Sequence, residues 1–119
     1  MIHDSRLAAR VRSILAAHGA VEERRMMGAL CFMAGGHMCC GVTGASVMVR
    51  VDRKAYAHTL TEPGVKPMQI GKRRATGFVL VEAGAIRSDA ALADWIARAM
   101  RFVSTLPPKG QVRRSRSPK

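Results

Sequence analysis

The chain has 119 residues, of which 48% are apolar and 24% charged, so it suits one globular domain and is not globally disordered. No apolar run approaches the roughly 20 residues of a membrane-spanning helix, and the charged first dozen residues lack the apolar core of a secretory signal. Twenty Lys and Arg against eight Asp and Glu give a net charge of +12, and three cysteines without framework spacing fit a reducing cytoplasm.

The first half of the chain predicts a helix and then an antiparallel meander. Asp4 or Ser5 can cap the helix, whose apolar residues recur at three- and four-residue steps until Gly19 ends it. The dipeptide Gly35-Gly36 tolerates the positive φ angles of a tight hairpin turn. Strands are therefore expected at residues 30–34, 37–42 and 46–51.

The second half predicts two more helices and two more strands. Asp52 is expected to cap a short helix that reaches about Leu60, with Ala55, Tyr56 and Leu60 facing inward. Prolines and a glycine at 63–67 indicate a loop, and the residues after it predict a short edge strand at 68–70 and a strand at 76–81. Ser88 is expected to cap the last helix, whose apolar stripe runs from Leu92 to Val103.

This order, α-β-β-β-α-β-β-α, predicts an α+β fold in which helices pack on one face of an antiparallel sheet. We expect one domain over residues 1–108 and a disordered basic tail over residues 109–119. The tail contains no acidic residue and five basic ones: Lys109, Arg113, Arg114, Arg116 and Lys119.

The densest group of reactive side chains is Cys31, His37, Cys39 and Cys40. If the glycine turn sets the hairpin register, Cys31 opposes Cys40, and these two share a face with Met33 and Met38, while Cys39 and His37 lie on the other face with Phe32 and Ala34. Two ligands per face do not make a tetrahedral zinc site, so no metal is expected. Cys31 and Cys40 would be placed to form a cross-strand disulfide under oxidising conditions, although buried, unreactive thiols are the commoner outcome.

No catalytic motif stands out in the sequence. There is no nucleophile elbow around Ser46, the Gly71-Lys72 pair lacks the other residues of a phosphate loop, and the histidines show no ligand spacing. We therefore expect no catalytic residue and no cofactor. Glu22 and Glu23, which precede two arginines, are interpreted as a solvated, ion-paired surface.

Lys72, Arg73 and Arg74 form the strongest basic cluster inside the folded region, and we expect them in a loop. Such a run is usually only solvated surface. The alternative interpretation is a stripe that contacts phosphates together with the tail residues Lys109, Arg113, Arg114 and Arg116. The five aromatic residues fall mostly at core-type positions, which weakens a base-stacking role; Trp95 is expected to anchor the last helix on the sheet.

The sequence resembles the TfoX/Sxy N-terminal domain family. The resemblance rests on RMMGALCFM (25–33), GHM (36–38), VMVRV (47–51), EPGVKPM (62–68), GFV (77–79), LxxW (92–95) and TLPPK (105–109), which occur in that order. It covers about residues 5–109. It implies an α+β module without enzymatic activity, cofactor or catalytic residues, and a link to the regulation of competence genes in bacteria.

Two departures from the family pattern stand out. A short Arg/Ser tail takes the place of the C-terminal helical domain of full-length competence regulators, and Met27 stands where the family often has an aromatic residue. Gly28 and Gly77 are interpreted as positions of turns or close strand approach. Arg25 and Arg50 are either charges on a sheet face or partner contacts.

Three functional hypotheses follow. The first is a non-enzymatic regulatory module that binds a protein or DNA through its basic surface, with a role in transcription as one option. The second is a small thiol-dependent redox protein or enzyme that uses Cys31, Cys39 or Cys40. The third, compatible with the first, is a homodimer that buries a sheet edge or the methionine-rich hairpin. No membrane association is expected.

Overall fold

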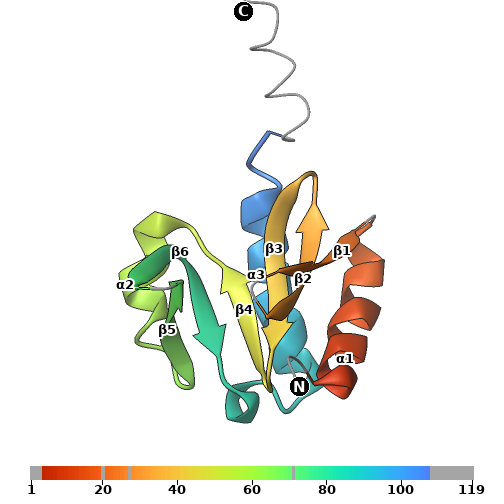
Figure 1. Ribbon diagram of the computed structural model, residues 1–119, viewed down its shortest axis with the longest axis horizontal. Coiled ribbons are helices and arrows are strands. Elements are labelled where there is room, and N and C mark those ends of the chain that lie inside the picture. The colour runs from red at the N-terminus through yellow and green to blue at the C-terminus, as the bar shows by residue number, and fades with distance from the viewer. Residues whose placement is uncertain (1–3, 20, 27, 71, 108–119) are drawn as a thin grey trace, which may run out of the picture.

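The computed structural model describes residues 4–19, 21–26, 28–70 and 72–107, and Figure 1 shows a sheet backed by two long helices. The helices are α1 (Ser5–Leu15), α2 (Tyr56–Thr59) and α3 (Asp89–Val103), and the 3-10 turns are η1 (Ala16–His18), η2 (Arg53–Ala55) and η3 (Ala83–Ala85). In the described part of the chain the strands are β1 (Glu22–Met26), β2 (Ala29–Ala34), β3 (His37–Thr43), β4 (Ser46–Arg50), β5 (Val65–Ile70) and β6 (Arg73–Val81).

All neighbouring strands are antiparallel, in the spatial order β1-β2-β3-β4-β6-β5. The expected α+β fold is confirmed, with one strand more than predicted, so the element order is α-β-β-β-β-α-β-β-α. The added strand is β1, an edge strand with the sequence EERRM whose residues are exposed almost throughout. It was missed because neither of its faces is buried, so it lacks the alternation of apolar and polar residues that marks a strand.

The ends of both long helices follow the expected capping chemistry. The Asp4 carboxylate accepts hydrogen bonds from the backbone N–H groups of Arg6 and Leu7, and the Ser88 hydroxyl accepts one from Ala91 N–H. Gly19 follows η1 with a φ of 113°, a conformation that favours glycine. Gly35 and Gly36 have φ angles of 61° and 84°, as the predicted hairpin turn requires.

The sheet has a helix-covered face and a methionine-rich face. Behind the sheet in Figure 1, α3 crosses β3 and β4, and α1 packs beside α3. Leu92, Trp95 and Ile96 of α3 belong to the main core with residues of α1 and of the central strands. The second cluster comes entirely from the strands: Ala29, Cys31, Met33, Met38, Met48 and Met68, with Met26, Phe78 and Leu80 against it.

A β-bulge in the β2–β3 hairpin corrects the predicted register. Ala34 pairs with His37 and Met33 with Met38, as expected, but the register then shifts, so Cys31 pairs with Gly41 rather than with Cys40. The extra residue turns Cys40 onto the same side as Cys39, into the helix-facing core, while Cys31 stays in the methionine cluster. The predicted cross-strand disulfide geometry is therefore wrong, and all three cysteines are free.

Three smaller predictions also need correction. Asp52 does cap the short helical segment through Lys54 N–H, but Ala55 is exposed rather than inward-facing. The predicted loop around Pro67 is instead part of the edge strand β5, which accommodates the proline with a register shift. Gly77 has no positive φ and no atom within 4 Å of where a Cβ would lie, so neither a turn nor close packing requires a glycine there.

Candidate anion-binding groove

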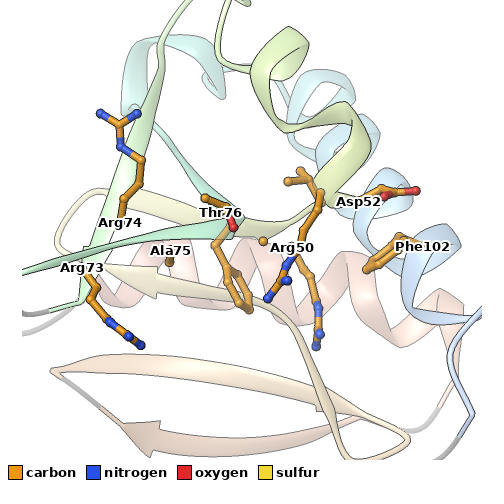
Figure 2. Close-up of a pocket in the computed structure, with 11 residues that line it drawn as sticks. Arg50, Asp52, Arg73, Arg74, Ala75, Thr76 and Phe102 are labelled. Carbon is orange, nitrogen blue, oxygen red and sulfur yellow. The ribbon is translucent and has the colours of Figure 1, made fainter.

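The described surface has a groove of about 600 Å³, which we call the arginine groove. One wall is the end of β4 and the start of η2, with Arg50, Asp52 and Arg53. The other is the first part of β6, from Arg73 to Phe78, and Phe102 of α3 closes one end. In Figure 2, Arg50 and Arg73 point to the same side, while Arg74 extends in the opposite direction.

Arg50 lies at the centre of the groove and is half-buried. It pairs with Phe78 across the β4–β6 ladder, and its guanidinium carbon lies 5.5 Å from the Phe78 ring centroid and 5.9 Å from that of Phe102. Its Nη1 lies 3.4 Å from the carbonyl oxygen of Met38. Burial, and then the neighbouring positive charge of Arg53, lower the pKa of Arg50, although an arginine remains protonated at neutral pH. The groove therefore holds a partly desolvated cation next to a second one.

The acidic residues of the chain do not neutralise these cations. The chain has eight Asp and Glu residues, and each carboxylate interacts with a backbone N–H group or with a basic residue outside the groove. Their partners are backbone N–H groups for Asp4 and Asp52, Arg24 for Glu22, Arg12 for Glu23, Arg98 for Glu62 and Asp94, Lys66 for Glu82 and Arg10 for Asp89. Across the described ranges, no carboxylate lies within ion-pair distance of Arg50, Arg53, Arg73 or Arg74. Four cations that no carboxylate pairs among the described residues therefore line one concave surface, where they favour an anionic ligand.

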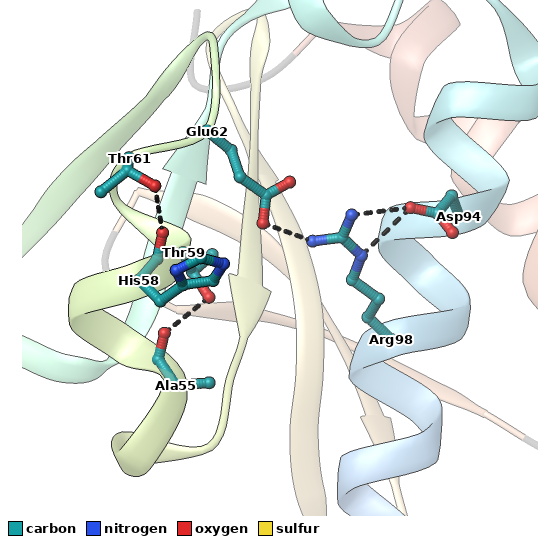
Figure 3. A network of polar contacts seen from close by, with 7 residues as sticks. All are labelled: Ala55, His58, Thr59, Thr61, Glu62, Asp94 and Arg98. Atoms are coloured by element: carbon teal, nitrogen blue, oxygen red, sulfur yellow. Dashed lines mark hydrogen bonds and ion pairs between the residues drawn. The ribbon is translucent and has the colours of Figure 1, made fainter.

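A second hollow of about 380 Å³ adjoins the groove and shares Arg50, Asp52 and Phe102 with it. Here Arg98 of α3 donates to Glu62 at 2.7 Å and to Asp94 at 3.0 Å, as Figure 3 shows. The hydrogen bond with Glu62 raises the pKa of Arg98. Because its charge is already paired, Arg98 serves to join α3 to the segment that follows α2 rather than to bind an anion.

The predicted basic residues are only partly brought together. Arg73 and Arg74 line the groove, but they form the start of β6 instead of the predicted loop, and Lys72 is exposed in the turn before them. Lys109, Arg113, Arg114 and Arg116 lie outside the described residues. The last described residue before them is Pro107, whose carbonyl oxygen accepts a 2.7 Å hydrogen bond from His37 Nε2. His37 precedes Met38, whose carbonyl oxygen Arg50 contacts.

Sequence reasoning missed three of the groove residues, Arg53, Phe78 and Phe102, and for Arg50 it left open whether the residue is a charge on a sheet face or a partner contact. The prediction that the aromatic residues are mostly core residues holds for Phe32, Tyr56 and Trp95 and is wrong for Phe78 and Phe102, which are half-buried and line the groove. No local pattern marks these residues, because β4, β6 and α3 meet only through long-range contacts.

Comparison with known families matches residues 13–103 to the TfoX N-terminal domain. The chain belongs to this family. The resemblance found from the sequence motifs is therefore confirmed, and the matched region contains every residue of the arginine groove. No curated protein and no solved structure matches the chain. Within the described ranges of this TfoX N-terminal domain, no helix is long and apolar enough to cross a membrane.

The cysteines of this TfoX N-terminal domain do not line the groove, and each is about 0% exposed. Burial raises the pKa of the Cys31 thiol. Cys39 Sγ donates to the carbonyl oxygen of Phe32 at 3.3 Å and lies 3.9 Å from Cys40 Sγ. This contact lowers the pKa of Cys39 and, with burial, raises that of Cys40 well above its usual value, so the pair does not ionise twice near neutral pH. Among the described residues, no cluster of three or more His, Cys, Asp or Glu side chains is placed to hold a metal ion.

We expect all three thiols to resist a water-soluble disulfide reagent at pH 8 until the domain unfolds, because the reagent must reach the sulfur atom. Titration of the native domain should give less than about one fast-reacting thiol, against three in denaturant. If one thiol reacts quickly in the native protein and this fast reaction is lost in a Cys39→Ala variant, the expectation is contradicted and the thiol-dependent hypothesis is supported.

Proposed function

We propose that this domain is a non-enzymatic regulatory module that binds nucleic acid through the arginine groove. The observation that carries the proposal is that one concave surface is lined by four arginines, Arg50, Arg53, Arg73 and Arg74, that have no carboxylate partner among the described residues. Guanidinium groups bind phosphate oxygens through paired N–H donors and keep their charge at any physiological pH. A chain of phosphates is the anion that several arginines together bind best.

Membership of the TfoX N-terminal domain family supports the regulatory part of the proposal. Through that family we assign the module to transcriptional regulation in the bacterial cytoplasm, which is also where three free thiols are stable. Five basic residues follow the described domain in the sequence, from Lys109 onward, and in this proposal they add positive charge for the same ligand. An acidic protein surface is the alternative partner that the same charges would attract.

The test compares two double variants with the same net charge. Arg53→Gln/Arg73→Gln removes two groove charges, whereas Arg6→Gln/Arg87→Gln removes two exposed charges that line no part of the groove. Binding of a labelled oligonucleotide is measured at several salt concentrations. We expect the groove variant to weaken binding about ten-fold or more at low salt and to reduce the slope of log K against log salt by about 2, one for each lost phosphate contact.

The control variant should bind nearly as the natural protein does. Equal losses in both variants would mean that only the total charge matters and would overturn the assignment to the groove. No binding by the natural protein at low salt would remove nucleic acid as the ligand and leave the acidic-protein alternative. A full-length variant with glutamine at positions 109, 113, 114, 116 and 119 measures the contribution of the tail separately.

A further inference from the structure

We infer that the arginine groove takes a single strand of nucleic acid, with a base stacked against Phe78 and Phe102 and the flanking phosphates on the arginines of the two walls. This inference rests on the proposed function and specifies the form of nucleic acid that the same surface recognises. It is carried by the shape of the groove, by its aromatic rings and by the placement of its cations.

The groove is concave, and concavity distinguishes a single strand from a duplex. Proteins that read a duplex insert a convex helix or two-stranded ribbon into one of its grooves. A hollow of about 600 Å³ is in the size range of small-molecule pockets, so it admits one or two unstacked nucleotides. The bases of a duplex are paired and stacked inside it, so they cannot enter the groove. Only the phosphates of a duplex would contact the groove, at its rim.

Two aromatic rings line this hollow next to the central cation. Phe78 comes from β6 and Phe102 from α3, and both are half-buried. The Arg50 guanidinium carbon lies 5.5 Å and 5.9 Å from the two centroids, whereas Arg98 lies 4.2 Å from the Trp95 centroid in the tightly packed pair elsewhere on α3. Arg50 is therefore near the outer limit of a cation–π contact with both phenylalanines and is closely stacked on neither. Aromatic rings and a planar guanidinium are the surfaces on which single-stranded bases stack.

The cations are placed on both sides of these rings. Arg53 extends from η2 on one wall and Arg73 from the start of β6 on the other, and both are exposed. The only carboxylate lining the groove in the described chain, Asp52, accepts a 2.9 Å hydrogen bond from Lys54 N–H, and Figure 2 shows it directed away from Arg73. A strand in the groove thus meets positive charge on either side of a base that lies at Phe78 and Phe102.

The experiment separates stacking from charge in the full-length protein. Fluorescence anisotropy measures binding of labelled oligo(dT) and of a hairpin duplex with the same number of phosphates, at one salt concentration. We expect oligo(dT) to bind at least about ten-fold more tightly than the duplex. Phe78→Leu/Phe102→Leu keeps apolar bulk but removes the aromatic rings. We expect this variant to bind oligo(dT) about 5- to 100-fold more weakly, because each stacked base contributes to the binding free energy, and to bind the duplex unchanged.

Two further measurements keep the test decisive if the leucine variant folds poorly. Arg50→Lys keeps the charge but removes the planar stacking surface, and we expect it to weaken oligo(dT) binding several-fold without affecting the duplex. Light-induced cross-linking of 5-bromouracil oligonucleotides to the natural protein should label the peptides that contain Phe78 or Phe102.

The possible failures are distinguishable. If Arg53→Gln/Arg73→Gln weakens both ligands but the leucine and lysine variants bind oligo(dT) normally, the groove binds phosphates without stacking, so this inference is overturned and the proposed function stands. Equal or tighter binding of the duplex would overturn it as well. If the arginine variant affects neither ligand, both the inference and the proposed function fail.

Discussion

Replacing Trp95 with alanine is expected to lower the free energy of unfolding by about 3–5 kcal/mol. Trp95 is 5% exposed and packs in the helix-facing core with residues of α1 and the central strands. Its removal leaves a cavity that α3 cannot close freely, because Arg98, three residues further along the same face of the helix, is tied to Glu62. Urea denaturation followed by circular dichroism measures the loss, since the variant has no tryptophan to report by fluorescence.

Two companion variants identify the cause of that loss. Trp95→Phe keeps most of the buried surface and should lose clearly less, although it gives up part of the ring face on which the Arg98 guanidinium lies at 4.2 Å. Arg101→Ala changes an exposed residue on the same helix and should change stability by no more than about 0.5 kcal/mol. A loss under about 1 kcal/mol for Trp95→Ala would mean that α3 repacks and that Trp95 is not the anchor that the sequence predicted.

Local chemistry made much of this fold predictable. The caps at Asp4, Asp52 and Ser88 and the turn at Gly35-Gly36 depend on residues within four positions of one another, so the sequence displays them directly. The apolar stripe of α3 was equally visible, because each stripe residue faces one continuous core.

Features that depend on long-range pairing were not predictable in the same way. The bulge at Cys39 lies in a strand that pairs with β2 on one side and β4 on the other, and its one extra residue places Cys40 on the face opposite to the predicted one. The groove depends on the pairing of Arg50 with Phe78, which are 28 positions apart, and on α3 bringing Phe102 beside them. A basic run such as Lys72-Arg73-Arg74 marks a charged surface but not the cavity that it lines.

The position of the groove follows from the strand order. After β4 the chain runs through η2, α2 and the edge strand β5 before β6 pairs with β4. The segment that leaves β4 forms the wall with Asp52 and Arg53, and β6 forms the opposite wall. The turn at Pro63-Gly64 then directs the chain into β5. Gly64 thus lies at the turn into β5, and β5 pairs with β6, the strand that forms the second wall.

We expect Gly64→Ala to lower the free energy of unfolding by about 2–4 kcal/mol, from positive-φ strain together with overpacking. Gly64 has a φ of +76°, and an added Cβ would lie 2.6 Å from the Cβ of Ala85, which is held in η3. The contact has little room to relax, since the Gly64 carbonyl also accepts a 2.8 Å hydrogen bond from Glu82 N–H, just before η3.

Gly28→Ala is the matched control, because Gly28 has a similar φ of +72° but no atom within 4 Å of the added Cβ. It should lose only the backbone contribution, about 1 kcal/mol. The difference between the two variants in urea denaturation therefore isolates the steric contact with Ala85. Equal losses would show that η3 moves aside without cost, and Gly64→Ala/Ala85→Gly, which removes the opposing Cβ, should recover most of the excess loss if the contact is its cause.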